Sequence, residues 1–307
     1  MATTRSVKNH LVYYAFTAAA AIFGALPESV VRRLGTWAGT YASRRSSARR
    51  ELLSSHMRRV LGPDASNAEV QKAVDGMYRS YGQYWAETFW FRPRRRETII
   101  NSVDRVHFQP VLDAQAAGRG IVFAVPHVGN WEIAGVIARD LGLDLMAVAE
   151  DLPNPLITQW FIDVRNNFGI DIVLTSDPER RSKMIRRLKA GGALALLADR
   201  DVTGKGVTVE FFGEETTVPA GPVALAELTN SVVLPVVAYF KDEGGYTIEV
   251  GDPIETPDTG TRSERVQLGS QRVADALEAQ IRKHPSQWHL FQPNWPSDSD
   301  IISSESA

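Results

Sequence analysis

The sequence contains no cysteine among its 307 residues. Without a thiol the protein has no disulfide, no thiolate zinc site and no cysteine nucleophile, so any nucleophilic catalysis must use an oxygen atom or proceed by direct transfer. Net charge is also nearly absent, at −2, while 44% of the residues are hydrophobic. This balance excludes disordered, collagen-like and disulfide-scaffold proteins and predicts a globular chain with a substantial core.

A hydrophobic run long enough to cross a bilayer is missing as well. The uncharged segment 11–26 has 16 residues, fewer than the about 20 that a spanning helix needs, and it is rich in alanine. A secretory signal with a small-residue cleavage region at 21–25 is the alternative, but basic and aromatic sequence continues directly after Pro27. We therefore expect residues 1–66 to form basic and apolar helices that associate with a membrane or close one end of the core.

Positive charge is concentrated in the first third of the chain. Residues 1–100 carry 16 Lys and Arg against 7 Asp and Glu, leaving 18 against 29 for the remainder. Many of these arginines occur in pairs, interleaved with aromatic residues such as Trp37 and Tyr41. Anionic lipid, nucleic acid and a simple solvated helix face all suit that pattern. Because no nucleic-acid recognition motif accompanies the arginines, we expect anionic lipid and no nucleic-acid partner.

From residue 68 onward, strand-like and helical segments alternate. Such alternation predicts an α/β fold with a mostly parallel central sheet flanked by helices. No linker interrupts the pattern, so we expect one α/β domain over residues 67–296, followed by a disordered acidic tail over 297–307. The predicted strands are 121–125, 143–150, 170–175, 193–199, 207–213, 232–240 and 246–250. The predicted helices are 68–91, 131–140, 155–168, 178–190, 222–230 and 265–283.

One strand end carries a histidine and a carboxylate. Sites in open α/β sheets form at the carboxyl edge of the strands, and His127 directly follows the strand 121–125. Glu132 falls in the first turn of the next helix, for which Asn130 is a candidate N-cap. A carboxylate that holds one ring nitrogen of a histidine leaves the other free to take a proton. The alternative is that Glu132 only complements the helix dipole.

A second strand ends in the run Ala198-Asp199-Arg200-Asp201. A surface ion-pair network is the common explanation for such a cluster. If this strand is a neighbour of the strand before His127, however, Asp199 comes within reach of the imidazole. It then competes with Glu132 for the role of orienting the ring.

Several other site signatures are absent. The six histidines are scattered without a metal-ligand spacing, so we expect no metal. Gly204-Lys205-Gly206 lacks the spacing of a phosphate-binding P-loop, which argues against ATP use. No Gly-x-Ser-x-Gly elbow occurs, which weighs against a serine hydrolase. A hydrolase of another type and a non-catalytic lipid-binding protein remain open at this point.

Six segments follow one another in the order of a known family. They are His127-x4-Glu132, Phe161-Ile-Asp-Val-Arg165-x3-Gly169, Ala198-Asp-Arg-Asp201, Gly206-Val-x-Val-x-Phe211-Phe-Gly213, Pro219-x-Gly-Pro222 and His284-Pro-x2-Trp288-His289-x2-Gln292-Pro-x-Trp295. Together, over about residues 10–296, they resemble the bacterial lipid A lauroyl/myristoyl acyltransferase superfamily, and within it the phosphatidylinositol mannoside acyltransferases of actinobacteria. A lone His-x4-Glu is weak evidence, but six ordered motifs across nearly the whole chain are specific.

The resemblance implies an O-acyltransferase that needs no cofactor and uses acyl-CoA as co-substrate. It would move a palmitoyl group to a mannose hydroxyl of phosphatidylinositol mannoside, as a peripheral protein on the cytoplasmic face of the cell inner membrane. His127 is then the general base, and Asp199 stands where the family has Glu. Because Asp is one methylene shorter, the division of labour between Asp199 and Glu132 stays open. A lipid A precursor or another glycolipid or phospholipid is the alternative acceptor.

The resemblance also implies substrate contacts. Glu150 and Arg165 match positions associated with the substrate groove, and Lys205 lies where relatives carry basic residues near the donor. Arg165 alternatively neutralises a phosphate of the lipid or of CoA. The basic helix 178–190 offers either a further phosphate contact or a solvated face. Since a thioester needs only a base and a donor for the oxyanion, the N–H groups of residues 129–131 are candidates for that donor.

Overall fold

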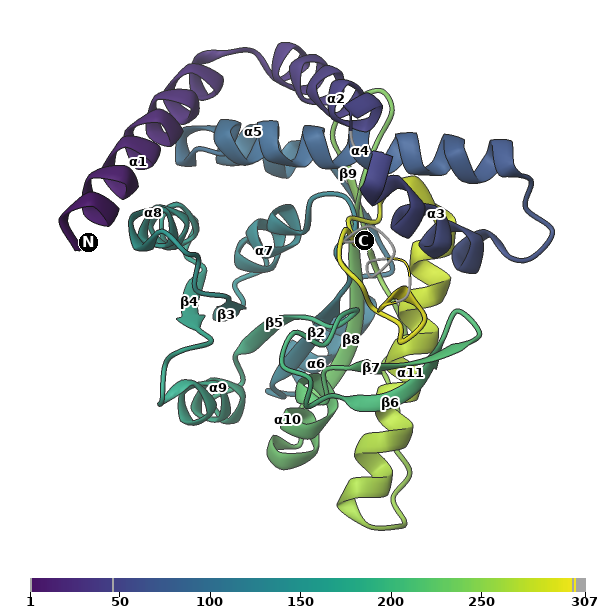
Figure 1. The fold of residues 1–307 in the computed structure, drawn as a ribbon. Helices are drawn as coiled ribbons and strands as arrows, with labels where there is room; N and C mark the ends of the chain where they lie inside the picture. Colours follow the sequence, from purple (N-terminus) through teal and green to yellow (C-terminus); the bar gives the residue numbers. More distant parts are fainter. Residues whose placement is uncertain (1, 46, 300, 302–307) are drawn as a thin grey trace.

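The computed structural model describes residues 2–45, 47–299 and 301 (Figure 1). Its main sheet has seven strands in the order β1-β9-β8-β2-β5-β3-β4, and all neighbours are parallel except β8 and β9. The predicted α/β fold with a mostly parallel sheet is confirmed. The strands of this sheet are β1 (Val103–Val106), β2 (Ile121–Val125), β3 (Leu145–Ala149), β4 (Asp171–Leu174), β5 (Ala193–Leu197), β8 (Val232–Phe240) and β9 (Tyr246–Val250).

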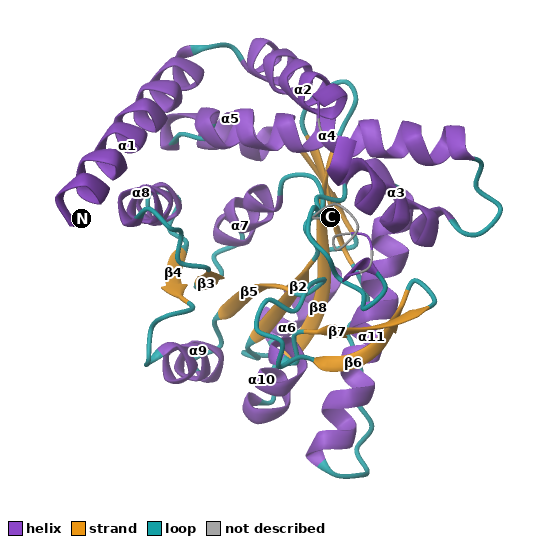
Figure 2. Ribbon diagram, in the orientation of Figure 1, coloured by secondary structure: helices purple, strands orange, loops and turns teal. Residues whose placement is uncertain are grey.

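Helices cover both faces of the sheet (Figure 2). Side chains of α6, α7 and α8 pack on one face, and those of α9, α10 and α11 pack on the other. The β2 strand lies in the middle and is buried along its whole length, which explains its continuous apolar sequence. The helices on the two faces are α6 (Gln109–Ala116), α7 (Trp131–Asp140), α8 (Pro155–Asn166), α9 (Arg180–Lys189), α10 (Gly221–Thr229) and α11 (Arg262–Lys283).

The N-terminal helices form a further layer, with α1 and α2 lying along α4 (Figure 1). A capping box starts α4, since Ser66 and Glu69 each accept a hydrogen bond from the other's backbone N–H. Glycines let α2 approach α4 closely: a Cβ atom on Gly39 would lie 2.1 Å from the carbonyl oxygen of Tyr78. The helices are α1 (Ala2–Ala25), α2 (Glu28–Arg45), α3 (Ser47–Leu61), α4 (Asn67–Trp90) and the short α5 (Arg96–Asn101).

Part of the arginine-rich sequence turns inward. Arg92 donates to the carbonyl oxygen of Ala20 at 2.6 Å, and Arg94 donates to that of Gly24 at 2.6 Å. The Gly24 carbonyl belongs to the last turn of α1, where the helix offers it no partner, and the Ala20 carbonyl lies one turn earlier. Arg92 and Arg94, which follow α4, therefore hold the C-terminal half of α1 on the domain.

None of the helices in the described part of the chain combines the length and the apolar character needed to cross a membrane.

Four helices and strands were not predicted, and one predicted strand lies outside the main sheet. Segment 207–213 forms β6 (Val207–Phe211), which pairs with β7 (Glu214–Val218) in a separate antiparallel hairpin. The elements missed are β1, β7, α5 and α6. The β1 strand is short, charged and mostly exposed, and β7 carries two glutamates, so neither shows a run of apolar residues.

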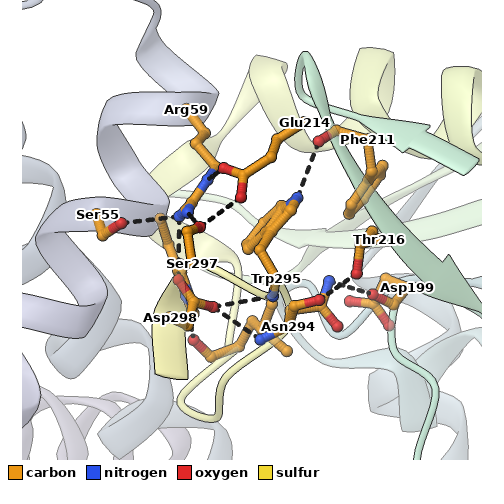
Figure 3. Close-up of polar contacts among 12 residues, drawn as sticks. Ser55, Arg59, Asp199, Phe211, Glu214, Thr216, Asn294, Trp295, Ser297 and Asp298 are labelled. Atoms are coloured by element: carbon orange, nitrogen blue, oxygen red, sulfur yellow. Dashed lines mark hydrogen bonds and ion pairs between the residues drawn. The ribbon is translucent and has the colours of Figure 1, made fainter. Parts of the chain in front are cut away.

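The predicted disordered tail is wrong at its start, while residues 300 and 302–307 lie outside the described part. Asp298 is fully buried, and its carboxylate accepts a hydrogen bond from His56 at 3.0 Å. It also accepts one from Arg59 at 3.2 Å (Figure 3). The backbone N–H groups of Asn294 and Trp295 donate to the same carboxylate. These long-range partners on α3 fix residues 288–298, which we call the C-terminal segment.

The Asp298 carboxylate makes stability depend on pH. Burial alone would raise its pKa, but hydrogen bonds from His56 and the backbone lower the pKa to about 2. The stabilisation is thus complete above pH about 4 and is lost as pH falls toward 2. We expect Asp298→Asn to lower the free energy of unfolding at pH 7 by about 3 kcal/mol, because it leaves buried donors without their charged partner.

Urea unfolding followed by circular dichroism measures this change. Glu214→Gln is the matched control, since Glu214 also pairs with Arg59 but is partly exposed, and it should cost less than about 1 kcal/mol. Equal losses for the two variants would contradict the assignment.

Candidate active site

The strand order brings His127 and Asp199 together. β2 and β5 are parallel neighbours, and Val125 on β2 is paired with Leu197 on β5. His127 and Asp199 each lie two residues beyond this pair. The condition set by the sequence, that the two strands be neighbours, is confirmed. Both side chains therefore meet at the carboxyl edge of the sheet.

Asp199 makes three hydrogen bonds at this edge. Its Oδ1 lies 2.7 Å from Nδ1 of His127, and its Oδ2 accepts from the His127 backbone N–H at 2.9 Å and from the Trp288 indole at 2.8 Å. The carboxylate is fully buried. Burial raises its pKa, but the charge and hydrogen bonds of His127 outweigh that effect and lower the pKa below the usual value. Asp199 is therefore ionised and fixes the orientation of the imidazole.

His127 presents its other nitrogen to a cavity. In the neutral ring, Nδ1 donates to Asp199, which leaves Nε2 free to accept a proton. The side chain is 22% exposed, its ring packs edge-on against Trp131 at 5.3 Å between centroids, and both residues line the cavity. This is the arrangement that a general base requires.

Glu132 is oriented away from this pair and binds Arg165. The Arg165 Nε and Nη2 atoms lie 3.0 Å and 2.5 Å from the two carboxylate oxygens. Burial lowers the pKa of Arg165, but the Glu132 carboxylate outweighs it and raises the pKa above the usual value. The sequence allowed either carboxylate as the partner of the imidazole. Asp199 contacts the ring, and Glu132 instead forms a bidentate ion pair with Arg165 on α8.

Asn130 does not cap α7 as predicted. Its side chain makes no cap hydrogen bond and donates to Glu87 at 3.0 Å. Glu87 is buried, which raises its pKa, and it also accepts from Gln83 and Tyr246, each at 2.8 Å. This network ties the turn after His127 to α4 and β9.

Two backbone N–H groups in the turn after His127 already donate to carbonyl oxygens. Gly129 N–H donates to the carbonyl of Gln287 at 2.9 Å, and Asn130 N–H donates to that of Ala238 at 3.0 Å. Two of the three predicted oxyanion donors are therefore already used. Trp131 N–H, in the first turn of α7, has no acceptor in the described part of the chain and stays a candidate.

A cavity of about 870 Å³ opens beside His127. Its volume falls within the roughly 300–1,000 Å³ of small-molecule sites, and most of its lining is apolar. Glu150 is exposed and lines it, as does Arg165. Lys205 lies on an exposed turn and is not among the described residues that line the cavity. Within the described ranges, no three His, Asp or Glu side chains are placed to hold a metal ion.

Sequence reasoning missed the roles of Trp288 and His289. Trp288 is fully buried and bonds Asp199, while the His289 N–H donates to the carbonyl oxygen of His127 at 2.7 Å. Burial lowers the pKa of His289 to about 3, so this ring is neutral. The C-terminal motif contained both residues, but a motif does not show contacts with residues 89 or more positions away in the chain.

These features define a class of protein: an α/β enzyme that carries a buried aspartate paired with a histidine beside a mostly apolar cavity. Residues 2–297 match the family of bacterial lipid A biosynthesis acyltransferases, and the chain belongs to that family. It is an acyltransferase.

Three relatives narrow the comparison. A phosphatidylinositol mannoside acyltransferase of Mycobacterium tuberculosis is 33% identical over 301 residues, which cover 95% of this chain and 91% of the relative. One of Mycolicibacterium smegmatis is 31% identical over 278 residues, covering 89% and 88%. A lipid A biosynthesis acyltransferase of Haemophilus influenzae is 20% identical over 265 residues, covering 86% and 79%.

The two carboxylates should respond differently to amide substitution. Asp199→Asn removes one acceptor oxygen, so at least one of the three N–H donors then faces an amide N–H. We expect acyl transfer to slow by about 10²- to 10⁴-fold, because the imidazole loses its orientation and its counter-ion. Glu132→Gln should slow transfer less than tenfold and mainly lower the melting temperature, because it leaves Arg165 without its charged partner. A larger rate loss in Glu132→Gln than in Asp199→Asn would contradict this division of roles.

Proposed function

We propose that the protein transfers a palmitoyl group from acyl-CoA to a mannose hydroxyl of phosphatidylinositol mannoside. The observation that carries the proposal is that His127, held by Asp199, lines a large and mostly apolar cavity. A long acyl chain can enter the cavity while its thioester stays next to the imidazole. The two mycobacterial relatives, which align over most of the chain, support the mannolipid as acceptor.

His127 acts as general base in this scheme. Its Nε2 takes the proton of the sugar hydroxyl while the hydroxyl oxygen attacks the thioester carbonyl. The tetrahedral intermediate collapses, the C–S bond breaks, and the proton passes from the imidazolium to the leaving CoA thiolate. Asp199 stabilises the imidazolium during these steps, and Trp131 N–H is the donor for the oxyanion. No covalent enzyme intermediate forms, consistent with the absence of cysteine.

The remaining predicted residues contact the substrates in this proposal. Glu150, exposed at the cavity, accepts hydrogen bonds from sugar hydroxyls. Arg165 has its charge balanced by Glu132, so its role is to hold a hydroxyl or ester oxygen and not to neutralise a phosphate by itself. Lys205 is free to reach phosphates of the donor from its exposed turn.

Acyl transfer by the purified protein tests the proposal. Palmitoyl-CoA is supplied with a mannosylated phosphatidylinositol, with a lipid A precursor, or without acceptor, and the lipid products are identified by mass spectrometry. Acylated mannolipid in the first tube alone is the expected result. Product from the lipid A precursor would favour the alternative acceptor, which the family and the Haemophilus relative suggest. Acyl release in every tube would make the protein a thioesterase.

In the same assay His127→Ala should lower the rate by about 10²- to 10⁴-fold, the usual contribution of a general base. His107→Ala is the matched control, because His107 is exposed, directly follows the edge strand β1 and pairs with Asp252. Near-full turnover by His127→Ala would rule out the base assignment.

We propose further that α2 binds the inner leaflet of the cell membrane from its cytoplasmic face. Trp37 and Tyr41 are exposed and stack on each other with centroids 6.0 Å apart, and Arg45 lies over the Tyr41 ring. Aromatic rings beside arginines suit the interface of an anionic bilayer. The exposed face of α2 thus supplies both apolar area and positive charge.

Vesicle sedimentation tests this membrane contact. We expect the double variant Trp37→Ala, Tyr41→Ala to bind vesicles containing phosphatidylinositol at least about tenfold more weakly, since each ring loses apolar burial. Leu268→Ala, at another exposed apolar position, on α11, is the control and should bind like the unmodified protein. Equal binding by all three proteins would refute the role of α2.

A further inference from the structure

Glu87 is a buried acid that the proposed reaction does not use. It lies in the last turn of α4, and the residue is only 1% exposed. Other residues of α4 line the cavity beside His127, but Glu87 is not among the described residues that do so. Removing a carboxyl group from water is costly unless hydrogen bonds replace the solvent. The contacts of Glu87 therefore indicate what it contributes to the protein.

Three hydrogen-bond donors converge on the Glu87 side chain. Its Oε1 accepts from Nε2 of Gln83 at 2.8 Å, and Nε of Arg32 lies 3.8 Å from the same oxygen. Its Oε2 accepts from Nδ2 of Asn130 at 3.0 Å and from the hydroxyl group of Tyr246 at 2.8 Å. These partners belong to α4, α2, the turn before α7, and β9. Glu87 thus joins that turn to three other elements.

The side chain of Asn130 depends on Glu87 for its orientation. Its Nδ2 donates to Glu87, whereas its Oδ1 is buried and has no hydrogen-bond partner in the described part of the chain. The backbone N–H of Asn130 donates to the carbonyl oxygen of Ala238 on β8 at 3.0 Å. The residue is therefore fixed from two sides, by β8 through its backbone and by Glu87 through its side chain.

The conformation of Asn130 sets the direction of the Trp131 N–H group. Asn130 has φ −126° and ψ 84°, outside the helical region, and its carbonyl oxygen accepts from the N–H of Ile133 at 3.1 Å. In a planar trans peptide the next N–H points opposite to the carbonyl group. The N–H of Trp131 therefore points out of the N-terminal end of α7. A rotation about ψ of Asn130 would turn this N–H away from its present direction.

We propose that Glu87 is a positioning residue, which holds Asn130 and thereby aims the Trp131 N–H at the oxyanion. The inference rests on the proposed acyl transfer, in which that N–H is the oxyanion donor. Glu87 does not touch the substrates and acts only through Asn130. A donor held in place before the reaction stabilises the developing charge more than a mobile one, because it need not reorganise.

Steady-state kinetics of palmitoyl-CoA cleavage test this role. The released CoA is measured with a thiol reagent, to which a protein without cysteine contributes no signal. Glu87→Met keeps the length of the side chain but removes both acceptor oxygens. We expect kcat to fall at least about tenfold with an unchanged KM, because the donor is misaligned while the cavity keeps its lining. The midpoint of the pH–rate profile should not move, since the hydrogen bonds of Asp199 do not involve Glu87.

Two further variants separate positioning from stability. Tyr246→Phe is the matched control, because it removes another donor from the same carboxyl oxygen without altering the turn before α7. It should lower the melting temperature and leave kcat unchanged. Glu87→Gln should restore most of kcat, because the amide oxygen still accepts from Asn130 while its NH2 group faces Gln83, whose amide can turn to accept. If Tyr246→Phe lowers kcat as much as Glu87→Met does, the inference is wrong.

Hydrogen–deuterium exchange measures the turn without substrate. The peptide 127–133 should exchange faster in Glu87→Met than in the unmodified protein, but not in Tyr246→Phe. If Glu87→Met does not fold, Asn130→Ala replaces it in both experiments, since it removes the amide and leaves Glu87 with its other partners. A full kcat in the folded variant overturns the inference, whatever the exchange rate.

The outcome is separable from that of the proposed function. If the unmodified protein cleaves palmitoyl-CoA but acylates no mannolipid, the acceptor assignment fails. The variants still decide the inference in that case, because thioester cleavage by any hydroxyl group or by water forms the same kind of oxyanion. If the unmodified protein cleaves no thioester, the proposed function fails and the exchange measurement alone decides whether Glu87 holds the turn.

Discussion

The site depends on one constraint, that the buried Asp199 carboxylate must have all its hydrogen bonds satisfied. A charge removed from water is tolerated only when close partners replace the solvent. Here the partners come from distant parts of the chain: His127 after β2, and Trp288 in the C-terminal segment. The pairing of β2 with β5 brings the first within reach, and the packing of the C-terminal segment brings the second. A change to either element therefore alters the orientation of the imidazole, even where the changed residue makes no contact with the ring.

Much of the fold and half of the site could be predicted because they depend on local pattern. Continuous apolar strands alternating with helices identify a parallel sheet, and the rule that sites form at carboxyl strand ends directs attention to His127 and Asp199. The sequence could not decide between Asp199 and Glu132, because that choice depends on strand order. It also gave no sign that Glu132 binds Arg165 on α8, that Asn130 binds Glu87 on α4, or that Asp298 is buried. Each of these contacts joins residues between 33 and 242 positions apart, and no periodicity encodes them.

The basic N-terminal third illustrates how composition misleads. Its excess of arginine suggests a surface for a polyanion, yet several of these side chains have partners inside the protein. Arg92 and Arg94 bind carbonyl oxygens of α1, Arg32 lies 3.8 Å from Glu87, and Arg59 joins α3 to the C-terminal segment. The guanidinium group has several donors in a fixed plane, which suits it to satisfy carbonyl groups and carboxylates where helices meet. Many of these arginines therefore stabilise contacts between helices, and only the other arginines are available to bind a membrane.

The position of Trp288 near the end of the chain has a consequence for biosynthesis. A polypeptide emerges from the ribosome with its N-terminal part first, and domains begin to fold as they emerge. When β5 has been made, His127 and Asp199 can already approach each other, but the indole that completes the carboxylate's environment has not yet been translated. Until then water must supply that hydrogen bond, and the pair stays solvated. The enzyme thus acquires a finished site only after nearly the whole chain has left the exit tunnel.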